Sequence, residues 1–249
     1  MALSDSTHNV SPALWHHHRL TIRTQVGALS LDIDLDLTRN WTVIFGPSGS
    51  GKSTILRAMA GLLPEAHARF IREDGDRNEH DLTHLPPRAR SIAYAPQQPA
   101  LFPHLTVADN IAFAQRFSGS PTSSAENINE AIKLFRLEDL LHRYPRNLSG
   151  GERQRVNLAR AFCVPNAKLM LLDEPFAGID RPLRDAILPE LRETLRYGGI
   201  PVVSVTHDVE EAFRLQPEVV VLHEGRIHAQ GYVSKVLADE RLSVLKALY

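Results

Sequence analysis

The stretch Gly46-Pro47-Ser48-Gly49-Ser50-Gly51-Lys52-Ser53-Thr54 decides the fold of this chain. It fits the pattern G-x-x-x-x-G-K-[ST], in which a glycine-rich loop turns its backbone N–H groups towards phosphate oxygens. The apolar run 41–45 before it suits a buried parallel strand, and residues 55–60 after it suit a helix. A surface turn rich in Gly and Ser is the alternative, but it explains neither these flanks nor the Lys-Ser pair. The sequence therefore predicts a site for a nucleoside triphosphate.

The residue types in this loop suit the phosphates of ATP and a bound Mg²⁺. The glycines let the backbone curl around an anion, and the helix that begins near Lys52 adds its positive N-terminal end. Lys52 is expected to reach the β- and γ-phosphates, and the Ser53 hydroxyl to complete the Mg²⁺ shell. All nine residues from Gly46 to Thr54 are thus predicted to contact the nucleotide.

Composition limits the class of protein. The 249 residues suffice for one large α/β domain or two small ones, with 43% hydrophobic and 23% charged residues. A net charge of −1 gives no electrostatic reason to expect nucleic acid as a partner. No apolar run approaches the roughly 20 residues that span a bilayer, and residues 1–10 lack the apolar core of a signal peptide. With Cys163 as the only cysteine, the chain is expected in the reducing cytoplasm, where it can still dock on a membrane protein.

Alternating strands and helices predict an α/β fold with a mostly parallel sheet. Residues 29–37 alternate leucine or isoleucine with polar residues, which indicates a half-buried antiparallel strand. Further strands are expected at 91–95, 168–172, 201–205 and 218–223, with a helix at 182–196. Residues 1–18 are interpreted as a flexible lead-in in which the adjacent histidines 16–18 are solvated.

The segment between about residues 99 and 160 has a helical pattern and is interpreted as an inserted α-helical subdomain. Thr106 and Ser123 are its expected N-caps, and Ser123 has capping-box spacing to Glu126. The subdomain is predicted to end in a helix that starts at Ser149.

Two more stretches have the chemistry of a phosphate site. Asp173 and Glu174 follow an apolar strand, so they are expected to emerge beside Lys52, Asp173 to hold Mg²⁺ and Glu174 to polarise the attacking water. Read alone, the two acids could also be a plain helix N-cap. Ser149, Gly150 and Gly151 open a helix whose free N–H groups suit a second anion, although Ser149 and Glu152 also have the spacing of a capping box.

These motifs, in this order, resemble the nucleotide-binding subunit of an ABC transporter over roughly residues 19–238, and the string LSGGERQR at 148–155 is among the more diagnostic strings in protein sequence. The resemblance implies a RecA-like P-loop NTPase fold, with an antiparallel β subdomain beside the parallel sheet. It also implies a head-to-tail homodimer, in which each ATP lies between residues 46–54 of one subunit and Ser149-Gly150-Gly151 of the other. That arrangement would account for the second anion site.

The same resemblance assigns roles to three further residues. Gln97 matches the glutamine that contacts Mg²⁺ and the attacking water, so Ser53, Gln97 and Asp173 are the expected metal ligands. His207 matches the switch histidine that contacts the γ-phosphate, and Asp180 matches the residue that couples the two sites across the dimer. One departure is that residues 20–29 lack the aromatic residue that usually stacks on adenine, and Trp15 lies further upstream.

Within the family, the chain is most similar to importer subunits, above all to those for molybdate. The resemblance implies two integral membrane permease subunits as partners, a periplasmic solute-binding protein acting indirectly, and a place at the cytoplasmic face of the membrane. Residues 101–107 resemble the segment that abuts the permease, although Leu101 and Phe102 also suit ordinary core. Importers of sulfate, polyamines, sugars or iron remain alternatives, as does a soluble ABC ATPase. Residues 239–249 are expected to form a helical tail, with no regulatory domain.

Overall fold

The computed structural model describes residues 17–63, 67–117, 122–215 and 217–239. Its strands are β1 His17–Val26, β2 Leu29–Leu37, β3 Trp41–Phe45, β4 Ala68–Glu73, β5 Glu79–Asp81, β6 Ile92–Ala95, β7 Leu169–Asp173, β8 Val202–Thr206, β9 Glu218–His223 and β10 Arg226–Tyr232. Its α-helices are α1 Lys52–Met59, α2 Val107–Ala112, α3 Thr122–Leu134, α4 Gly150–Phe162, α5 Arg181–Tyr197, α6 Val209–Leu215 and α7 Val233–Val236. Short 3-10 turns are η2 Pro87–Ala89, η3 Phe113–Phe117, η4 Glu138–Leu140 and η5 Pro145–Asn147.

The strands form one sheet in the order β5-β4-β1-β2-β10-β9-β3-β8-β7-β6. Its half from β9 to β6 is parallel, and β3, β7 and β8 are buried on both faces. That burial explains their continuous apolar sequence. In the other half the pairs β1–β2, β1–β4 and β4–β5 are antiparallel, and β2 alternates buried and exposed residues as predicted. The α/β fold with an antiparallel β portion is confirmed.

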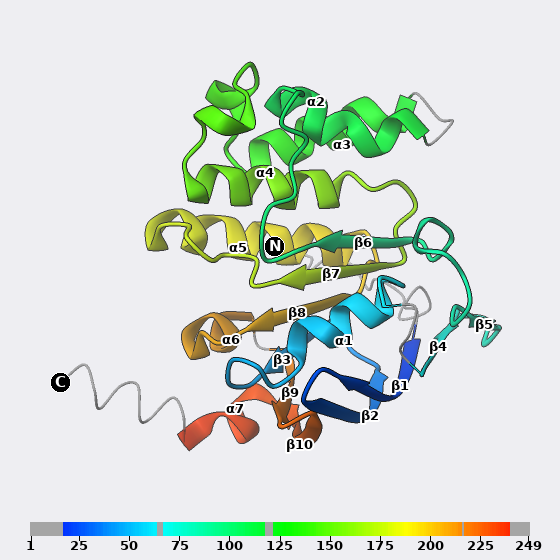
Figure 1. Cartoon of the computed structure of the whole chain (residues 1–249). Coiled ribbons are helices and arrows are strands. Elements are labelled where there is room, and N and C mark those ends of the chain that lie inside the picture. The colour runs from blue at the N-terminus through cyan, green and yellow to red at the C-terminus, as the bar shows by residue number, and fades with distance from the viewer. Residues whose placement is uncertain (1–16, 64–66, 118–121, 216, 240–249) are drawn as a thin grey trace, which may run out of the picture.

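Helices cover the two faces of the parallel half and extend it at one edge. Ile55 and Leu56 of α1 pack with Leu171 and Val203, while Leu188 of α5 belongs to the core on the other face. The elements from α2 to α4 lie between β6 and β7 in the chain and form a helical layer beyond β6 (Figure 1). No helix in the described ranges is long and apolar enough to cross a membrane.

The N-terminal lead-in ends earlier than expected. His17 and His18 already belong to β1, and His18 is only 1% exposed and stacks on Phe70 at 5.7 Å between ring centroids. The prediction that the histidines are solvated is therefore wrong for His18. The strand pairs with β4, which is more than 40 residues away in the chain, and that long-range pairing buries the ring.

The helical insertion confirms one expected N-cap and corrects the other. Thr106 caps α2 by accepting from the Asp109 N–H. Ser123 lies inside α3, which begins at Thr122, so it is not an N-cap. Trp15, and the tail predicted for residues 240–249, lie outside the described residues.

Candidate nucleotide site

The phosphate-loop pattern lies between β3 and α1, as its flanks predicted. Lys52 is the first residue of α1 and is only 7% exposed. Its Nζ donates to the carbonyls of Gly46 and Pro47, both at 2.8 Å. Burial lowers the pKa of Lys52, and the nearby Glu174 and Asp173 carboxylates oppose that shift. Because its partners are neutral carbonyls of the loop itself, this ammonium can exchange them for the stronger acceptors of a phosphate.

Packing, as well as flexibility, requires two of the glycines in this loop. A Cβ on Gly46 would lie 2.1 Å from the Leu222 carbonyl oxygen, and one on Gly51 would lie 2.6 Å from Leu31 Cδ2. Gly51 also has φ +103°, a conformation that only glycine adopts at low cost. The loop is thus pressed against β2 and β9 and held in one shape. That rigidity suits a site that must present several N–H groups at once.

The carboxyl end of β7 brings two acids to the start of α1. The Ser53 hydroxyl donates to Asp173 Oδ1 at 2.9 Å, and Asp173 is 3% exposed. Burial raises the pKa of Asp173, and the hydrogen bond from Ser53 opposes that shift. Oxygen ligands are those that Mg²⁺ prefers, so a hydroxyl and a carboxylate in contact fit this ion. Within the described ranges there is no cluster of three His, Cys, Asp or Glu that could hold another metal ion.

Glu174 occupies a strained backbone position opposite His207. Its φ is 47°, in the left-handed region that costs a non-glycine residue about 1–2 kcal/mol. The backbone is held there, since its N–H donates to Val205 O at 3.0 Å and its carbonyl accepts from Gln154 Nε2 at 3.2 Å. Glu174 Oε1 then lies 3.4 Å from His207 Nδ1. Strain that is held by surrounding bonds is a feature of functional sites.

Three further predicted site residues are Gln97, Ser149 and Asp180. Gln97 follows β6 in an exposed bend. Ser149 is exposed and forms a complete capping box with Glu152 at the start of α4, so the second reading of that motif is correct in the structure. Asp180 accepts from the Leu183 N–H and caps α5. In the part of the chain that the structure describes, no hydrogen bond or ion pair joins any of these three residues to Lys52 or Asp173.

The structure adds two residues that sequence reasoning missed. The Tyr94 hydroxyl lies 3.4 Å from Asp173 Oδ2, and burial is the main cause that raises its pKa to about 12. Gln154 is 2% exposed and also donates to the Pro175 carbonyl at 3.1 Å. Tyr94 lies on β6, directly beside β7, so the pairing of these neighbouring strands was the signal that could have identified it.

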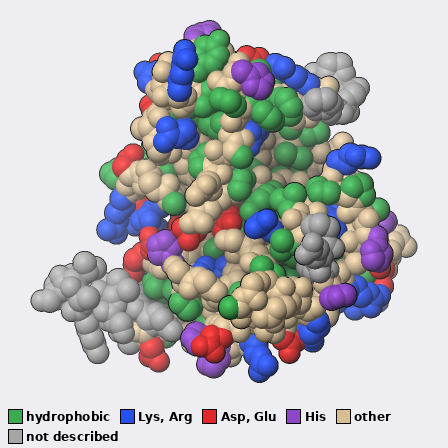
Figure 2. Space-filling model, viewed as in Figure 1, with side chains coloured by type: hydrophobic (Ala, Val, Ile, Leu, Met, Phe, Trp, Pro, Cys, Tyr) green, Lys and Arg blue, Asp and Glu red, His purple; other side chains and the backbone are tan. Residues whose placement is uncertain are grey.

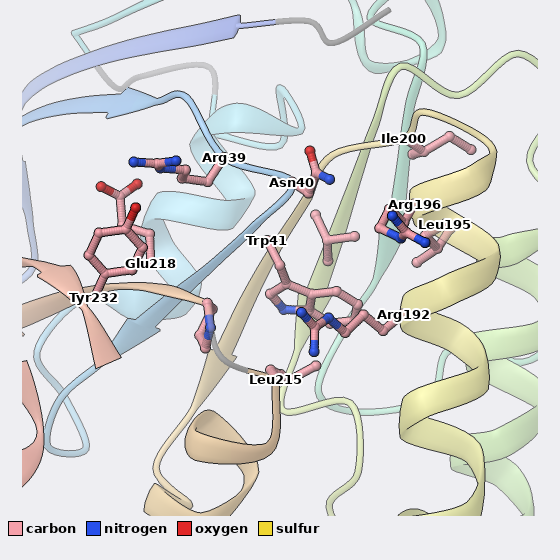
Figure 3. Close-up of a pocket in the computed structure, with 12 residues that line it drawn as sticks. Arg39, Asn40, Trp41, Arg192, Leu195, Arg196, Ile200, Leu215, Glu218 and Tyr232 are labelled. Carbon is pink, nitrogen blue, oxygen red and sulfur yellow. The ribbon is translucent and has the colours of Figure 1, made fainter. Parts of the chain in front are cut away.

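A separate cavity of about 240 Å³ lies at the opposite edge of the parallel strands. Figure 3 shows Trp41 at its centre, with Arg39, Glu218 and Tyr232 to one side and Arg192 of α5 in front. Trp41 and Glu218 are the first residues of β3 and β9, whereas Asp173 is the last residue of β7 and Lys52 begins α1, which follows the carboxyl end of β3. This cavity is therefore distinct from the candidate nucleotide site.

On the face that carries α1, charged side chains of both signs are interspersed (Figure 2).

Known proteins share both the sequence and the fold. The model of the family described as "ABC transporter" matches residues 31–177. The "Molybdenum import ATP-binding protein ModC" of Rhodopseudomonas palustris is 40% identical over 228 residues, which are 90% of this chain and 60% of that protein. The "Molybdate/tungstate import ATP-binding protein WtpC" of Archaeoglobus fulgidus is 37% identical over 224 residues, 90% of both chains. The "Sulfate/thiosulfate import ATP-binding protein CysA" of Synechocystis is 41% identical over 207 residues, which are 82% of this chain and 57% of that protein.

Among solved structures, a dimeric ATP-binding cassette in a post-hydrolysis state bound to ADP and Pi superposes with a TM-score of 0.74 at 25% identity. The match covers 87% of this chain and 98% of that one. The P-loop NTPase fold is thereby confirmed. The chain spans about 60% of the length of the ModC relative that it matches.

Proposed function

The chain belongs to the ABC transporter family of ATP-binding proteins, and from that premise we propose that it binds and hydrolyses ATP to drive a membrane importer. The observation that carries this proposal is the meeting of two pairs at one edge of the sheet. One pair is Ser53 with Asp173 at 2.9 Å, and the other is Glu174 with His207 at 3.4 Å. A metal ligand pair beside a base and its partner is what hydrolysis of a phosphoanhydride requires.

Different residues of this chain would bind the phosphates, hold the metal ion and accept the proton. The loop 46–54 and Lys52 bind the phosphates, and the Ser53 hydroxyl and Asp173 carboxylate, with Gln97, hold Mg²⁺. When bound, Mg²⁺ neutralises charge on the phosphate oxygens. Glu174 accepts the proton of the attacking water, and its strained, bonded backbone keeps the carboxylate in one place. His207, on the other side of that carboxylate, is exposed enough to contact the γ-phosphate.

The second anion site supports a head-to-tail dimer. Ser149 and Gly150 are exposed at the N-terminal end of α4, and no atom lies within 4 Å of the position of a Cβ on Gly150. The open N-terminal turn of a 13-residue helix is suited to bind an anion. In the proposed homodimer this turn would close over the ATP held by residues 46–54 of the other subunit. Asp180, two residues after Gly178, would then lie near the subunit boundary.

The proposed partners are two membrane permease subunits, reached through the segment 101–107 at the cytoplasmic side of the membrane. This segment is held firmly, because the buried Asn110 donates to the carbonyls of Phe102, Leu105 and Thr106. The Phe102 ring packs on Phe113 at 4.2 Å between centroids. A rigid, half-buried loop of this kind can transmit a force.

The proposed solute is molybdate or a related oxyanion, delivered by a periplasmic binding protein. The similarity to ModC and WtpC supports this choice, and the similarity to CysA makes sulfate the second candidate. Transport of radiolabelled molybdate and sulfate in cells that lack the gene, with and without its return, would decide between the two solutes.

Hydrolysis is tested by Glu174→Gln. We expect ATP affinity to stay within about twofold and phosphate release to fall by at least about 100-fold, which is within the range for loss of a positioned base. Glu193→Gln is the control, since Glu193 is an exposed carboxylate on α5 that pairs with Arg196. Turnover by Glu174→Gln above half the normal rate would contradict the assignment of Glu174.

A further inference from the structure

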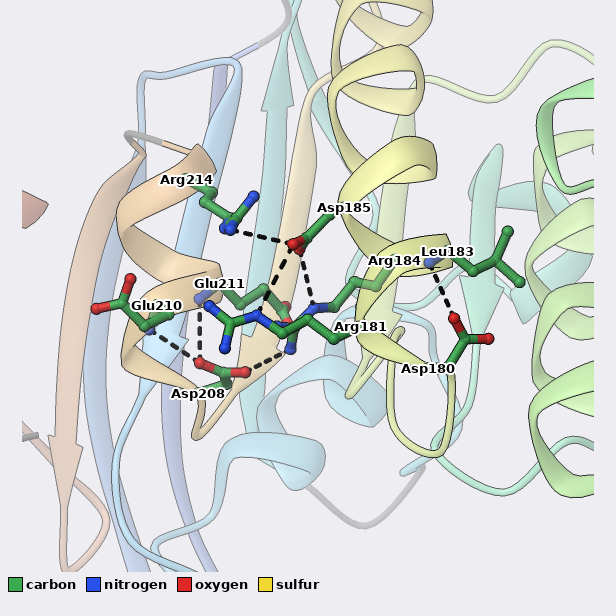
Figure 4. A network of polar contacts seen from close by, with 9 residues as sticks. All are labelled: Asp180, Arg181, Leu183, Arg184, Asp185, Asp208, Glu210, Glu211 and Arg214. Atoms are coloured by element: carbon green, nitrogen blue, oxygen red, sulfur yellow. Dashed lines mark hydrogen bonds and ion pairs between the residues drawn. The ribbon is translucent and has the colours of Figure 1, made fainter. Parts of the chain in front are cut away.

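An ion pair links the helix that follows the 177–180 loop to the loop that carries His207. Arg184 lies in the first turn of α5, and its Nη1 lies 2.5 Å from Asp208 Oδ2 (Figure 4). The Arg184 side chain is only 14% exposed, which separates it from the solvent-exposed ion pairs of this protein. Asp208 is the residue directly after His207. The pair therefore joins α5, which follows the loop 177–180, to the loop that carries His207.

The Asp208 carboxylate is held on both sides. Its Oδ1 accepts the backbone N–H groups of Glu210 at 2.9 Å and Glu211 at 3.1 Å. Its own N–H donates to Thr206 Oγ1 at 3.0 Å, just before His207. Arg184 holds the other oxygen, so the chain on either side of His207 has a defined path. A substitution of Arg184 would thus change the position of His207, although the two side chains do not touch.

The same N-terminal end of α5 also lies close to the start of α4. Asp180 caps α5, and the Arg184 N–H donates to the Asp180 carbonyl at 2.9 Å. Gly178 lies two residues before Asp180, and its carbonyl oxygen is only 2.5 Å from the position of a Cβ on Gly151. A continuous set of contacts therefore runs from the Ser149–Gly151 turn, through α5, to His207, without passing through residues 46–54.

We propose that Arg184 is a positioning residue that, through Asp208, holds His207 against Glu174 and ties that arrangement to the loop 177–180. This inference rests on the proposed ATP hydrolysis. Among the described residues no hydrogen bond or ion pair joins Arg184 to Glu174 or His207, so its effect is on the geometry of the site and not on the chemistry itself. The competing interpretation is that the ion pair only fastens α5 to α6. In that case its loss would lower stability and leave the action of His207 unchanged.

The neighbouring Arg181 provides a matched control. It is also a cation in the first turn of α5, but its side chain is 68% exposed and its Nε lies 3.8 Å from Asp185. The experiment measures kcat and KM for ATP, and the melting temperature, of the full chain and of Arg184→Gln, Asp208→Asn, their double variant and Arg181→Gln. Asparagine keeps an oxygen that can accept the N–H groups of residues 210 and 211, so Asp208→Asn removes mainly the ion pair. Arg184→Gln is also measured in a His207→Ala background.

If Arg184 positions His207, Arg184→Gln lowers kcat about tenfold and leaves KM within about twofold, and Arg181→Gln changes neither by more than twofold. The kcat of the double variant is no lower than that of the slower single variant, because both substitutions remove the same Arg184–Asp208 ion pair. In the His207→Ala background, Arg184→Gln costs less than a further twofold in kcat. Arg184→Lys, which keeps the charge, recovers part of the lost rate.

Three results would overturn the inference. One is a rate for Arg184→Gln equal to that of the unaltered chain. Another is a loss in kcat on Arg184→Gln that is as large in the His207→Ala background as in the unaltered chain. The third is a double variant whose loss in kcat is the product of the losses of the two single variants. An unaltered chain that releases no phosphate from ATP would contradict the proposed function itself, and this outcome is distinguishable from the other three.

Discussion

Among single residues, Glu211 shows how burial beside the site changes an ordinary carboxylate. It is 4% exposed in α6, and burial, followed by the nearby Asp208 carboxylate, raises its pKa to about 8. In the unfolded chain its pKa is close to the ordinary glutamate value of 4.5. Between these two values the folded protein binds more protons than the unfolded one, so the free energy of unfolding falls as pH rises. Glu211 is therefore expected to be protonated in the folded protein near neutral pH.

Glu211→Gln keeps the shape of the neutral acid and cannot ionise, so its melting temperature should fall less than that of the unaltered chain between pH 6 and pH 9. Scanning calorimetry at half-unit intervals measures the difference. Glu193→Gln, at a half-exposed ion-paired position, should follow the unaltered chain. Parallel curves for the Glu211→Gln and unaltered proteins would show that Glu211 does not hold a proton in the folded state.

Between elements, close packing of α4 on the loop 177–180 leaves different amounts of space for a side chain at the adjacent Gly150 and Gly151. A Cβ on Gly151 would meet the Gly178 carbonyl oxygen at 2.5 Å, whereas one on Gly150 would meet nothing within 4 Å. Both lie in the first turn of α4 and neither has a positive φ. The two differ, therefore, in what surrounds them and not in their own backbone.

We expect Gly151→Ala to destabilise the fold by about 1–3 kcal/mol, because the loop or the helix must move to admit the methyl group. For a chain of this size that corresponds to a lower melting temperature, by about 2–4 °C per kcal/mol. Gly150→Ala should leave the melting temperature unchanged or raise it slightly, since alanine favours helix over glycine. Equal melting temperatures for the two variants, measured side by side, would argue against this contact.

Local sequence predicted the parallel strands and missed part of the antiparallel half. The run 41–45 and the strand 218–223 match β3 and β9 to the residue, because their apolar residues need no distant partner to be recognised. By contrast β1 pairs with β4 across more than 40 residues of chain. The burial of His18 depends on that pairing, and so no local pattern indicated it. Ser123 failed as an N-cap because α3 begins before it.

At the scale of the whole molecule, the site combines residues that were predictable with contacts that were not. Parallel strands end at one edge, so the approach of Asp173 to Ser53 follows from topology alone. The Arg184–Asp208 pair joins α5 to the loop just before α6, and the relative placement of these two segments depends on the complete fold. The same holds for Gln154, which reaches from α4 to the Glu174 backbone. If the proposed anion site at Ser149–Gly151 belongs to the nucleotide site, a complete site requires two chains.

The last prediction tests assembly of that site in trans. Ser48 and Asn147 are exposed, in the phosphate loop and just before Ser149, and Asn147→Cys leaves the Ser149 cap in place. In a head-to-tail dimer these positions of different subunits should come together. Two differently tagged chains, one Ser48→Cys and one Asn147→Cys, are therefore expected to crosslink through a short bis-maleimide when MgATP is present. The native Cys163 does not interfere, because it is 1% exposed and burial raises the pKa of its thiol to about 12, so little reactive thiolate forms.

Two controls make this result specific. Tyr197→Cys places a thiol at the exposed C-terminal end of α5, 66% exposed in the native residue, and should give no crosslink to Ser48→Cys. Adding Lys52→Ala to the Ser48→Cys chain should weaken the specific crosslink, because that subunit then lacks the ammonium that is proposed to bind phosphate. Both expected effects require the nucleotide to bridge the subunits. A crosslink of equal yield without ATP, or none with it, would contradict a dimer in which the Ser149–Gly151 turn of one subunit completes the nucleotide site of the other.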